Sequence, residues 1–572
     1  MRVDDSWRKL ASNDLAVLVL WATAGVLLHT VTNGQYGFHR DELATLDDAR
    51  SLEWGYVAYP PLTPFLARVA LILFGPSLVG LRFFAAVALG LVLVLTGLMA
   101  RHLGGGRQAQ IVAALAAAIG GVAFGGGRLF QYVSFDYLWW VAAAYFMVRL
   151  LASDDPRWCL GVGVAIGLGM LTKYTMMFLA VGIACGFLLT PARRFLRSPW
   201  LWCGIALALV IFLPNLLWQI RHHFVSLDFL KNIHARDIRM GRTDSFVLEQ
   251  FWIATNPPTV PLWLAGLFYL FATPDGKRYR PIGWMFIVPF VLFVVGKARG
   301  YYLAPGYPML FAAGAVWGER WVASLSTRRA LVIRRTTWMA LAIGALVDAA
   351  IVLPIPPPGS LWWQFADRAN GGNFNEEIGW PEFVQTIASI RDSLPVEERS
   401  RLGILAGDSG QAGAINLYGP TLKLPRAICG MNSHWLRGYG DPPPETVIVV
   451  GMSRDFAQRA FESCQIAGHV SNRFGIGNST IRNPDIFVCH SLRQPWPQFW
   501  RGFQYYGSVR LPSLKEAWSG NELGSVCWQH VSAGELVGGH PSNSALWKLR
   551  PKLWAEGWTD SFQPPCARLT AR

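Results

Sequence analysis

The chain has 572 residues, of which 52% are hydrophobic and only 15% are charged, and its formal net charge is +15. Globular chains rarely combine so many apolar residues with so few charges, so this composition predicts a membrane protein that also carries a soluble part. The basic residues fall in short clusters between apolar stretches rather than on one soluble face, which excludes a nucleic-acid-binding protein.

Residues 14 to about 353 consist mostly of apolar stretches separated by short polar loops. A helix needs about 20 apolar residues to cross the hydrocarbon core of a bilayer. We therefore expect eleven spans, near residues 14–32, 78–100, 108–124, 136–152, 158–172, 174–190, 200–217, 258–273, 282–296, 306–324 and 336–353. The first span is long and lacks a small-residue cleavage site, so we expect it to stay as an anchor rather than to be removed as a signal peptide.

Basic residues predict the orientation of these spans. If the N-terminus lies inside, every cytoplasmic loop is basic, from Arg8 and Lys9 before the first span to Arg334 and Arg335 before the last. This distribution follows the positive-inside rule. An odd number of spans then places residues 354–507 outside, so we expect a protein of the cytoplasmic (inner) membrane with an extracytoplasmic domain.

The first outer loop, residues 33–77, carries the acidic pair Asp41-Glu42. Charges beside a membrane span are costly and usually functional. An ionised carboxylate only accepts hydrogen bonds, so Asp41 suits a catalytic base, and we expect partial burial to raise its pKa. Glu42 is expected in the same catalytic site, where it orients the loop or binds the acceptor. The alternative is a charge pair at a helix N-terminus, stabilised by the helix dipole.

Further cations and aromatic residues lie beside other outer helix ends. As a set they predict a site for an anionic headgroup such as a phosphate, with solvated or snorkelling charges as the alternative. The candidate phosphate-binding residues are Arg128, Lys173, Arg221, Lys297 and Arg299. The candidate substrate-binding residues are Tyr59, Asp136, Tyr301, Tyr302 and His222.

Some of these candidates have a second interpretation. Asp136 is either a second acid in the same cavity or a helix N-cap, and Tyr301 and Tyr302 alternatively belong to an interfacial aromatic belt. The pair His222-His223 lacks a clear third ligand. No metal site is therefore assigned, and dependence on a divalent metal stays open.

Residues 354–507 alternate helix and strand patterns and predict a compact α/β domain. We expect helices at 381–393 and 454–467, the latter with Ser453 as its N-cap, and strands at 402–406, 446–451 and 486–489. Five cysteines follow span eleven, at positions 429, 464, 489, 527 and 566, and Cys464–Cys489 is the preferred disulfide in this oxidising environment. No role is assigned to residues 508–572.

Several motifs in the first 505 residues resemble one group of membrane enzymes. They lie at residues 36–43, 55–62, 171–174, 213–219, 301–308, 407–416 and 430–435. Together and in this order they resemble glycosyltransferase family 39 of the GT-C superfamily, which includes protein O-mannosyltransferases, lipid A aminoarabinose transferases and lipopolysaccharide-core transferases. Relatives often place an acidic residue and a histidine or lysine directly before Pro60-Pro61, where this chain has Ala58 and Tyr59.

The resemblance implies a polytopic GT-C fold, in residues 1–353, with Asp41 as the catalytic base. It also implies an inverting transferase that moves a sugar from a polyprenyl-phosphate donor to a lipid, glycan or protein acceptor of the envelope. Two other functions compete with this one, a carrier (flippase) of lipid-linked sugars and a non-catalytic envelope assembly protein. The identities of the sugar and the acceptor are not encoded in any motif.

Overall fold

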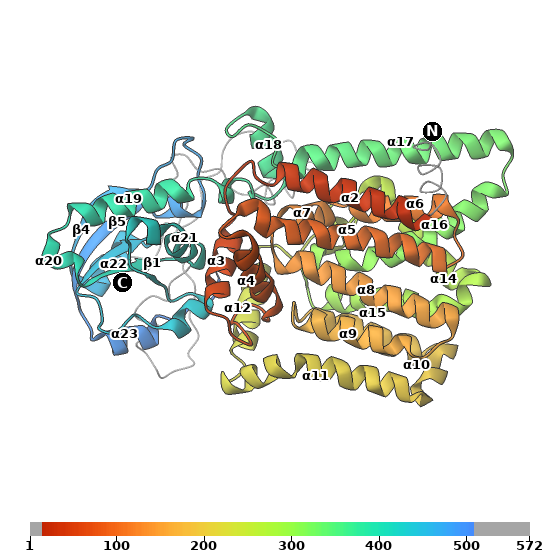
Figure 1. The fold of residues 1–572 in the computed structure, drawn as a ribbon, viewed down its shortest axis with the longest axis horizontal. Coiled ribbons are helices and arrows are strands. Elements are labelled where there is room, and N and C mark those ends of the chain that lie inside the picture. Colours follow the sequence, from red (N-terminus) through yellow and green to blue (C-terminus); the bar gives the residue numbers. More distant parts are fainter. Residues whose placement is uncertain (1–13, 508–572) are drawn as a thin grey trace, which may run out of the picture. The chain divides into compact units, whose positions relative to one another are not determined.

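In the computed structural model, the described residues are 14–507. Long helices form the first part of the chain, and Figure 1 shows them running side by side along a common direction. Their bounds are α2 Asp14–Thr32, α5 Leu78–His102, α6 Arg107–Ala118, α7 Gly121–Arg128, α8 Tyr132–Ser153, α9 Trp158–Met170, α10 Met176–Leu188, α11 Pro199–Arg221, α14 Val260–Ala272, α15 Arg280–Val295, α16 Tyr307–Ala323 and α17 Thr327–Val352.

Six of the described helices are long and apolar enough to cross a membrane, or up to eight if each of two bent pairs forms one span. The first bent pair is α6 with α7, at 69°, and the second is α10 with the 3-10 helix Pro191–Arg197, at 104°. Each of the eleven expected spans contains a helix, so a multi-pass membrane protein is confirmed. The number of spans and their orientation stay predictions.

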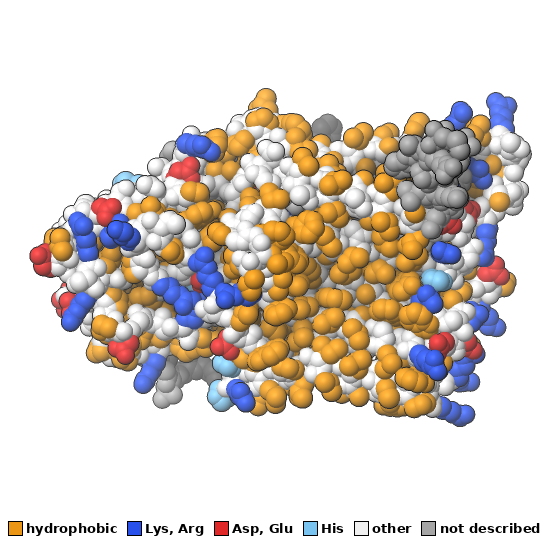
Figure 2. Space-filling model, in the orientation of Figure 1, with side chains coloured by type: hydrophobic (Ala, Val, Ile, Leu, Met, Phe, Trp, Pro, Cys, Tyr) orange, Lys and Arg blue, Asp and Glu red, His pale blue; other side chains and the backbone are white. Residues whose placement is uncertain are grey.

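Hydrophobic and basic side chains occupy different regions of the surface of the helical part. In Figure 2, hydrophobic side chains cover most of this part, and Lys and Arg side chains gather at its right-hand end. Basic residues also lie at the turn between two of these helices, with Arg101 and His102 in the last turn of α5 and Arg107 in the first turn of α6. The arrangement is the one expected for a cytoplasmic boundary under the positive-inside rule.

Two short helices follow α2 and occupy the predicted first outer loop, α3 Arg40–Arg50 and α4 Leu62–Phe74. A capping box starts α3: the Nδ1 atom of His39 accepts a hydrogen bond from the backbone N–H of Asp41 (3.1 Å), and Glu42 accepts one from the N–H of His39 (2.8 Å). Such reciprocal caps satisfy two of the free N–H groups at a helix start. The first turn of α3 is therefore fixed by its own sequence.

Other connections that are predicted to lie outside also contain short helices. They are α12 Val225–Arg239, α13 Phe246–Glu249 and the 3-10 helix Gly300–Gly306. The segment from α12 to α13 connects α11 with α14, and the 3-10 helix connects α15 with α16. These connections bring the residues discussed below next to α3.

Residues 361–502 form a five-stranded mixed sheet with flanking helices, and their separation from the helices as a domain of their own stays a prediction. The strands are β1 Leu402–Ala406, β2 Ala427–Ile428, β3 Thr446–Val450, β4 Phe461–His469 and β5 Asp485–Leu492, in the order β2-β1-β3-β5-β4. The helices are α18 Leu361–Ala369, α19 Trp380–Ser393, α20 Val396–Arg399, α21 Ser409–Tyr418, α22 Arg454–Ala460 and α23 Trp496–Gly502. Strands β1 and β3 pair in parallel and are buried along their length, as central strands usually are.

The predicted helix over 454–467 is wrong in its second half. Ser453 does cap α22, but the helix ends at Ala460 and strand β4 begins at the next residue. Antiparallel pairing with β5, a partner distant in the sequence, overrides the local helical pattern. The pairing places Cys464 opposite Cys489, and these two form the predicted disulfide. The cysteines at 527 and 566 lie outside the described residues.

Candidate active site

Asp41 lies in the first turn of α3, and its carboxylate is accessible. Its side chain is 55% exposed, and Nε2 of Gln131 donates a hydrogen bond to Oδ2 over 3.2 Å. Gln131 is the N-cap residue of α8, so two helix starts meet at this carboxylate. The alternative interpretation, a charge at a helix N-terminus, is therefore correct as a description of position. It does not compete with a catalytic role, because the carboxylate is free on one side.

The prediction that burial raises the pKa of Asp41 is wrong. Desolvation does act in that direction, but the positive charge of Arg40, with a further contribution from Arg299, outweighs it and holds the pKa of Asp41 below its usual value. The nearest of these charges is the guanidinium of Arg40, whose Nε lies 3.5 Å from Oδ1. Asp41 is consequently ionised at neutral pH and can accept a proton.

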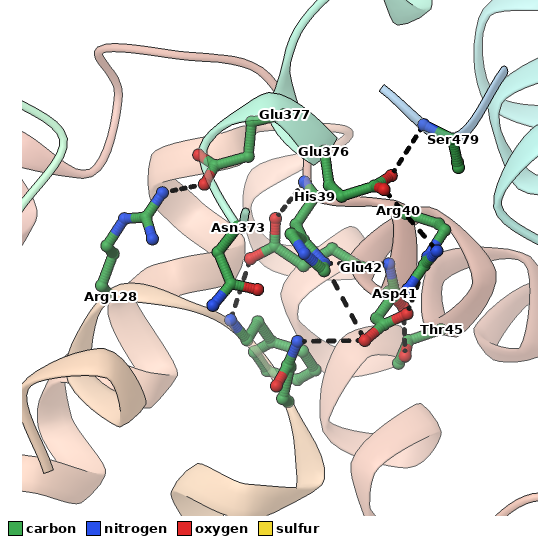
Figure 3. Close-up of polar contacts among 12 residues, drawn as sticks. His39, Arg40, Asp41, Glu42, Thr45, Arg128, Asn373, Glu376, Glu377 and Ser479 are labelled. Atoms are coloured by element: carbon green, nitrogen blue, oxygen red, sulfur yellow. Dashed lines mark hydrogen bonds and ion pairs between the residues drawn. The ribbon is translucent and has the colours of Figure 1, made fainter. Parts of the chain in front are cut away.

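Glu42 has a different environment from Asp41, and its predicted place in the catalytic site stays a prediction. The side chain is fully buried, and Arg82 of α5 donates to it through Nε (2.8 Å) and Nη2 (2.7 Å). Backbone N–H groups of Phe130 and His39 each donate to it over 2.8 Å. Figure 3 shows the carboxylates of Asp41 and Glu42 directed at different partners. Glu42 anchors the start of α3, which matches the loop-orienting role that the sequence also suggested.

Arg128 is likewise unavailable as a phosphate ligand. It is buried, forms an ion pair with Glu377, and stacks over the ring of Phe374 at 4.4 Å from the centroid. Glu377 also accepts a hydrogen bond from Arg82 over 3.1 Å. The network of Glu42, Arg82, Arg128 and Glu377 joins α3, the long helix α5, the short helix α7 and the segment before α19. Sequence reasoning placed Arg128 at the correct end of the helices but did not foresee a buried partner almost 250 residues away.

Lys173 lies in a cage of three tyrosines and one acid. Its Nζ is 3.5 Å from Oδ2 of Asp136, and 4.1, 5.2 and 5.5 Å from the ring centroids of Tyr302, Tyr301 and Tyr132. Tyrosine faces attract a cation at these distances. Four predicted residues, namely Lys173, Asp136, Tyr301 and Tyr302, are thus brought together. The N-cap interpretation of Asp136 is wrong, because α8 begins at Tyr132.

Three arginines converge on one buried carboxylate beside this cage. Arg299 donates two hydrogen bonds of 2.6 Å to Asp237, and the guanidiniums of Arg236 and Arg242 lie 3.2 and 3.6 Å from its Oδ1. One carboxylate, only 4% exposed, cannot balance three guanidiniums. Burial and repulsion from Arg299 and Arg236 lower the pKa of Arg242, which is what a local excess of positive charge produces. We call these three residues the arginine cluster.

Arg299 was predicted, whereas Arg236, Arg242 and Gln131 were not assigned to the site. The signal that could have found the first two is their spacing on either side of Asp237 in an outer connection. Gln131 carries no such signal, because its role depends on where α8 begins. Arg299 adds to the effect of Arg40 in lowering the pKa of Asp41.

The remaining predicted residues lie elsewhere. Tyr59 donates a hydrogen bond to Oδ2 of Asp48 over 2.5 Å, and its ring centroid is 6.0 Å from that of Tyr132. His222 stacks on Trp218 at 3.9 Å, and Arg221 and Lys297 are exposed. Within residues 14–507, no contact joins these last three side chains to the surroundings of Asp41, so their predicted roles are not supported. The same part of the chain holds no group of three or more His, Cys, Asp or Glu side chains arranged for a metal ion.

Comparison with known proteins gives one family model and several relatives. The model described as dolichyl-phosphate-mannose-protein mannosyltransferase matches residues 58–218. The lipid A galacturonosyltransferase RgtD of Rhizobium johnstonii is 25% identical over 259 residues, which are 44% of this chain and 53% of that protein. The chain therefore spans about half the length of this curated relative.

Solved structures extend the likeness to most of the chain. ArnT from Cupriavidus metallidurans bound to undecaprenyl phosphate matches with a TM-score of 0.55 at 15% identity, over 82% of this chain and 97% of that one. The apo state of the same protein matches over the same shares with a TM-score of 0.53. At this identity the structural likeness establishes the fold alone. The comparisons confirm the resemblance to glycosyltransferase family 39 and to the GT-C fold.

Proposed function

We propose that this chain is an inverting glycosyltransferase that moves a sugar from a polyprenyl-phosphate donor to an envelope acceptor. The reaction takes place at the outer face of the cytoplasmic membrane. The observation that carries this proposal is the pairing of an accessible, ionised carboxylate, Asp41, with the arginine cluster beside it. A base and a site for an anionic leaving group are what such a transfer requires.

Each group has a role in a single displacement. Asp41 takes the proton of the acceptor hydroxyl as its oxygen attacks the anomeric carbon of the sugar. The bond between that carbon and the phosphate oxygen breaks, and its electron pair leaves with the polyprenyl phosphate. Arg299 and Arg242 stabilise the charge of the departing phosphate, and Lys173 supplies a further cation from the tyrosine cage. Attack opposite to the leaving group inverts the anomeric configuration.

The relatives support the classes of donor and acceptor. RgtD is named as a transferase that acts on lipid A, and the ArnT structure contains undecaprenyl phosphate, a polyprenyl phosphate. We infer the same donor class for this chain and a lipid-anchored glycan as its acceptor, with membrane lipids around the helices. The α/β domain then lies on the extracytoplasmic side, where the acceptor arrives.

The test compares envelope glycolipids by mass spectrometry from cells with the intact chain, without it, and with Asp41→Asn. The matched control is Asp455→Asn, which changes an exposed aspartate of α22 that pairs with Arg459. We expect one sugar-sized mass to be absent from the glycolipids of cells without the chain and normal in the control cells. With Asp41→Asn we expect the rate at which this sugar is added to fall roughly 10²–10⁴-fold. A mass that persists in Asp41→Asn cells but is lost without the chain would refute catalysis and favour transport or assembly.

A further inference from the structure

The C-terminal half of α3 is held by residues of the α/β domain. Asp47 is buried, and it contacts Nε2 of His434 at 2.8 Å and accepts a hydrogen bond from Nδ2 of Asn416 over 2.9 Å. Arg437 forms an ion pair with the same carboxylate. Although burial acts to raise it, the contacts with His434 and Arg437 hold the pKa of Asp47 well below its usual value. Asp47 is therefore ionised at neutral pH and pairs with the guanidinium of Arg437.

Arg437 bridges two consecutive acids of α3. One Nη atom pairs with Asp47 and the other with Asp48, and the side chain of Arg437 is only 16% exposed. Among the described residues, the basic groups within 4 Å of either carboxylate all belong to the segment 426–437 of the α/β domain. Within residues 14–353, the structure shows no cation paired with either of these two buried acids. Their charges are compensated only when the α/β domain is in place.

Two structural routes lead from Arg437 to Asp41. Along α3, the residues Asp41, Thr45 and Asp48 are spaced i, i+4 and i+7 and share one face, and Thr45 donates a hydrogen bond to the backbone oxygen of Asp41 over 2.8 Å. At 1.5 Å per residue, Asp48 lies about 10 Å along the helix from Asp41.

The second route runs through Tyr59, which bonds Asp48 and packs against Tyr132. Tyr132 follows directly after Gln131, the residue that donates to Asp41. Movement of Asp48 would therefore disturb both sides of the catalytic carboxylate.

Helix α3 packs closely against α21 of the α/β domain, and this packing depends on two glycines. A Cβ atom at Gly413 would overlap the backbone oxygen of Leu43, and one at Gly410 would overlap the side chain of Arg40. Only glycine permits the two helices to lie so near. The sequence GDSGQAGAIN, residues 407–416, which the motif comparison singled out, is thus the surface on which the catalytic helix rests.

We propose that Arg437 is a positioning residue, and that the α/β domain completes the active site by fixing α3 through Asp47 and Asp48. This inference rests on the proposed function in so far as it takes Asp41 as the base. It assigns the domain a role that differs from covering the cavity or selecting the acceptor. Because Arg437 is largely enclosed between two carboxylates, it has no free face for a substrate.

The first arm of the test separates kcat from KM. Purified Arg437→Met and Arg437→Lys variants are assayed with donor lipid extracted from cells that lack the chain. The control is Arg459→Met, an arginine of the same domain with an exposed i,i+4 partner. We expect Arg437→Met to lower kcat at least tenfold with the donor KM unchanged within a factor of two, Arg437→Lys to restore part of it, and the control to match the parent chain.

The second arm needs no transferase activity. Asp41→Cys is combined with Arg437→Met or Arg459→Met, and the rate of labelling by a membrane-impermeant maleimide is measured on the peptide that contains position 41. We expect a change of at least fivefold with Arg437→Met and none with Arg459→Met. This arm distinguishes failure of the positioning role from failure of the proposed reaction.

Folding is controlled by scoring both arms per amount of protein that carries the Cys464–Cys489 disulfide. A kcat lowered only in proportion to the amount of folded protein, or a labelling rate that Arg437→Met leaves unchanged, would overturn the positioning role.

Discussion

Asp41 and Glu42 are neighbours in the chain, yet the side chain of Asp41 is 55% exposed whereas that of Glu42 is fully buried against Arg82. Consecutive residues in a helix differ by about 100° around the axis, so one carboxylate faces the arginine cluster and the other faces the helical bundle. In the proposed function, the two acids therefore have separate roles: Asp41 is the reactive group, and Glu42 anchors the helix that carries it. The pair of cations follows the same division, with Arg299 near Asp41 and Arg82 bound to Glu42.

Glu42→Gln should affect stability more than Asp41→Asn does. Breaking a buried ion pair leaves an uncompensated charge and costs about 3–5 kcal/mol, whereas losing an exposed charge at a helix start costs about 0.3–1 kcal/mol. Thermal unfolding of both purified variants in the same detergent measures the difference. Equal midpoints for Glu42→Gln and the parent chain would contradict the anchoring role.

The pH profile of kcat/KM should show no fall in weak acid that is due to protonation of Asp41. The pKa of Asp41 lies below its usual value, about 3.9 in model peptides, so the carboxylate stays ionised as the pH falls from 7 to 5 and loses its basic form only below that range. Arg40 is the largest of the charges that lower this pKa, and Glu376 and Asp408 are the acids facing Arg40. Arg40→Gln should therefore raise the pKa and move the acid limb of kcat/KM to higher pH. A limb near pH 6 in the parent chain would contradict this assignment.

Local patterns were sufficient to predict much of this protein. The apolar lengths predicted the helices, β1 was predicted with its exact bounds, and Asp41 was found from the motif around it. These features depend on residues close together in the sequence.

Features that depend on distant partners were missed. The ion pairs of Arg128 with Glu377 and of Arg437 with Asp47 join residues that are far apart in the sequence, and no periodicity reports such pairs. Each of these ion pairs buries an arginine whose residue type alone would suggest a cation available to bind substrate. The helix predicted at 454–467 failed for a related reason, because strand pairing decides its second half.

Arg242→Gln should weaken donor use more than Lys297→Gln. Arg242 belongs to the arginine cluster and is half-exposed, so it can reach a phosphate, whereas Lys297 is exposed without a contact to this cluster. A charge-assisted hydrogen bond contributes about 1.5–3 kcal/mol, which corresponds to roughly a 10–100-fold rise in donor KM. Steady-state kinetics with extracted donor lipid would test this. Equal effects of the two substitutions would remove the cluster from the donor site.

Reduction of the Cys464–Cys489 disulfide should lower the stability of the α/β domain and, through it, the temperature at which activity is lost. Closing a loop of 25 residues stabilises a fold by about 3 kcal/mol in the chain-entropy model. The loss begins at the edge of the sheet, since β4 pairs only with β5, and it reaches the catalytic helix because α21 and Arg437 belong to the same domain. Activity and unfolding midpoints measured with and without dithiothreitol should therefore fall together. The double variant Cys464→Ser/Cys489→Ser should start at the lower value and not respond to the reductant. If activity survives at temperatures where the reduced domain has unfolded, α3 does not need the domain to hold Asp41 in place.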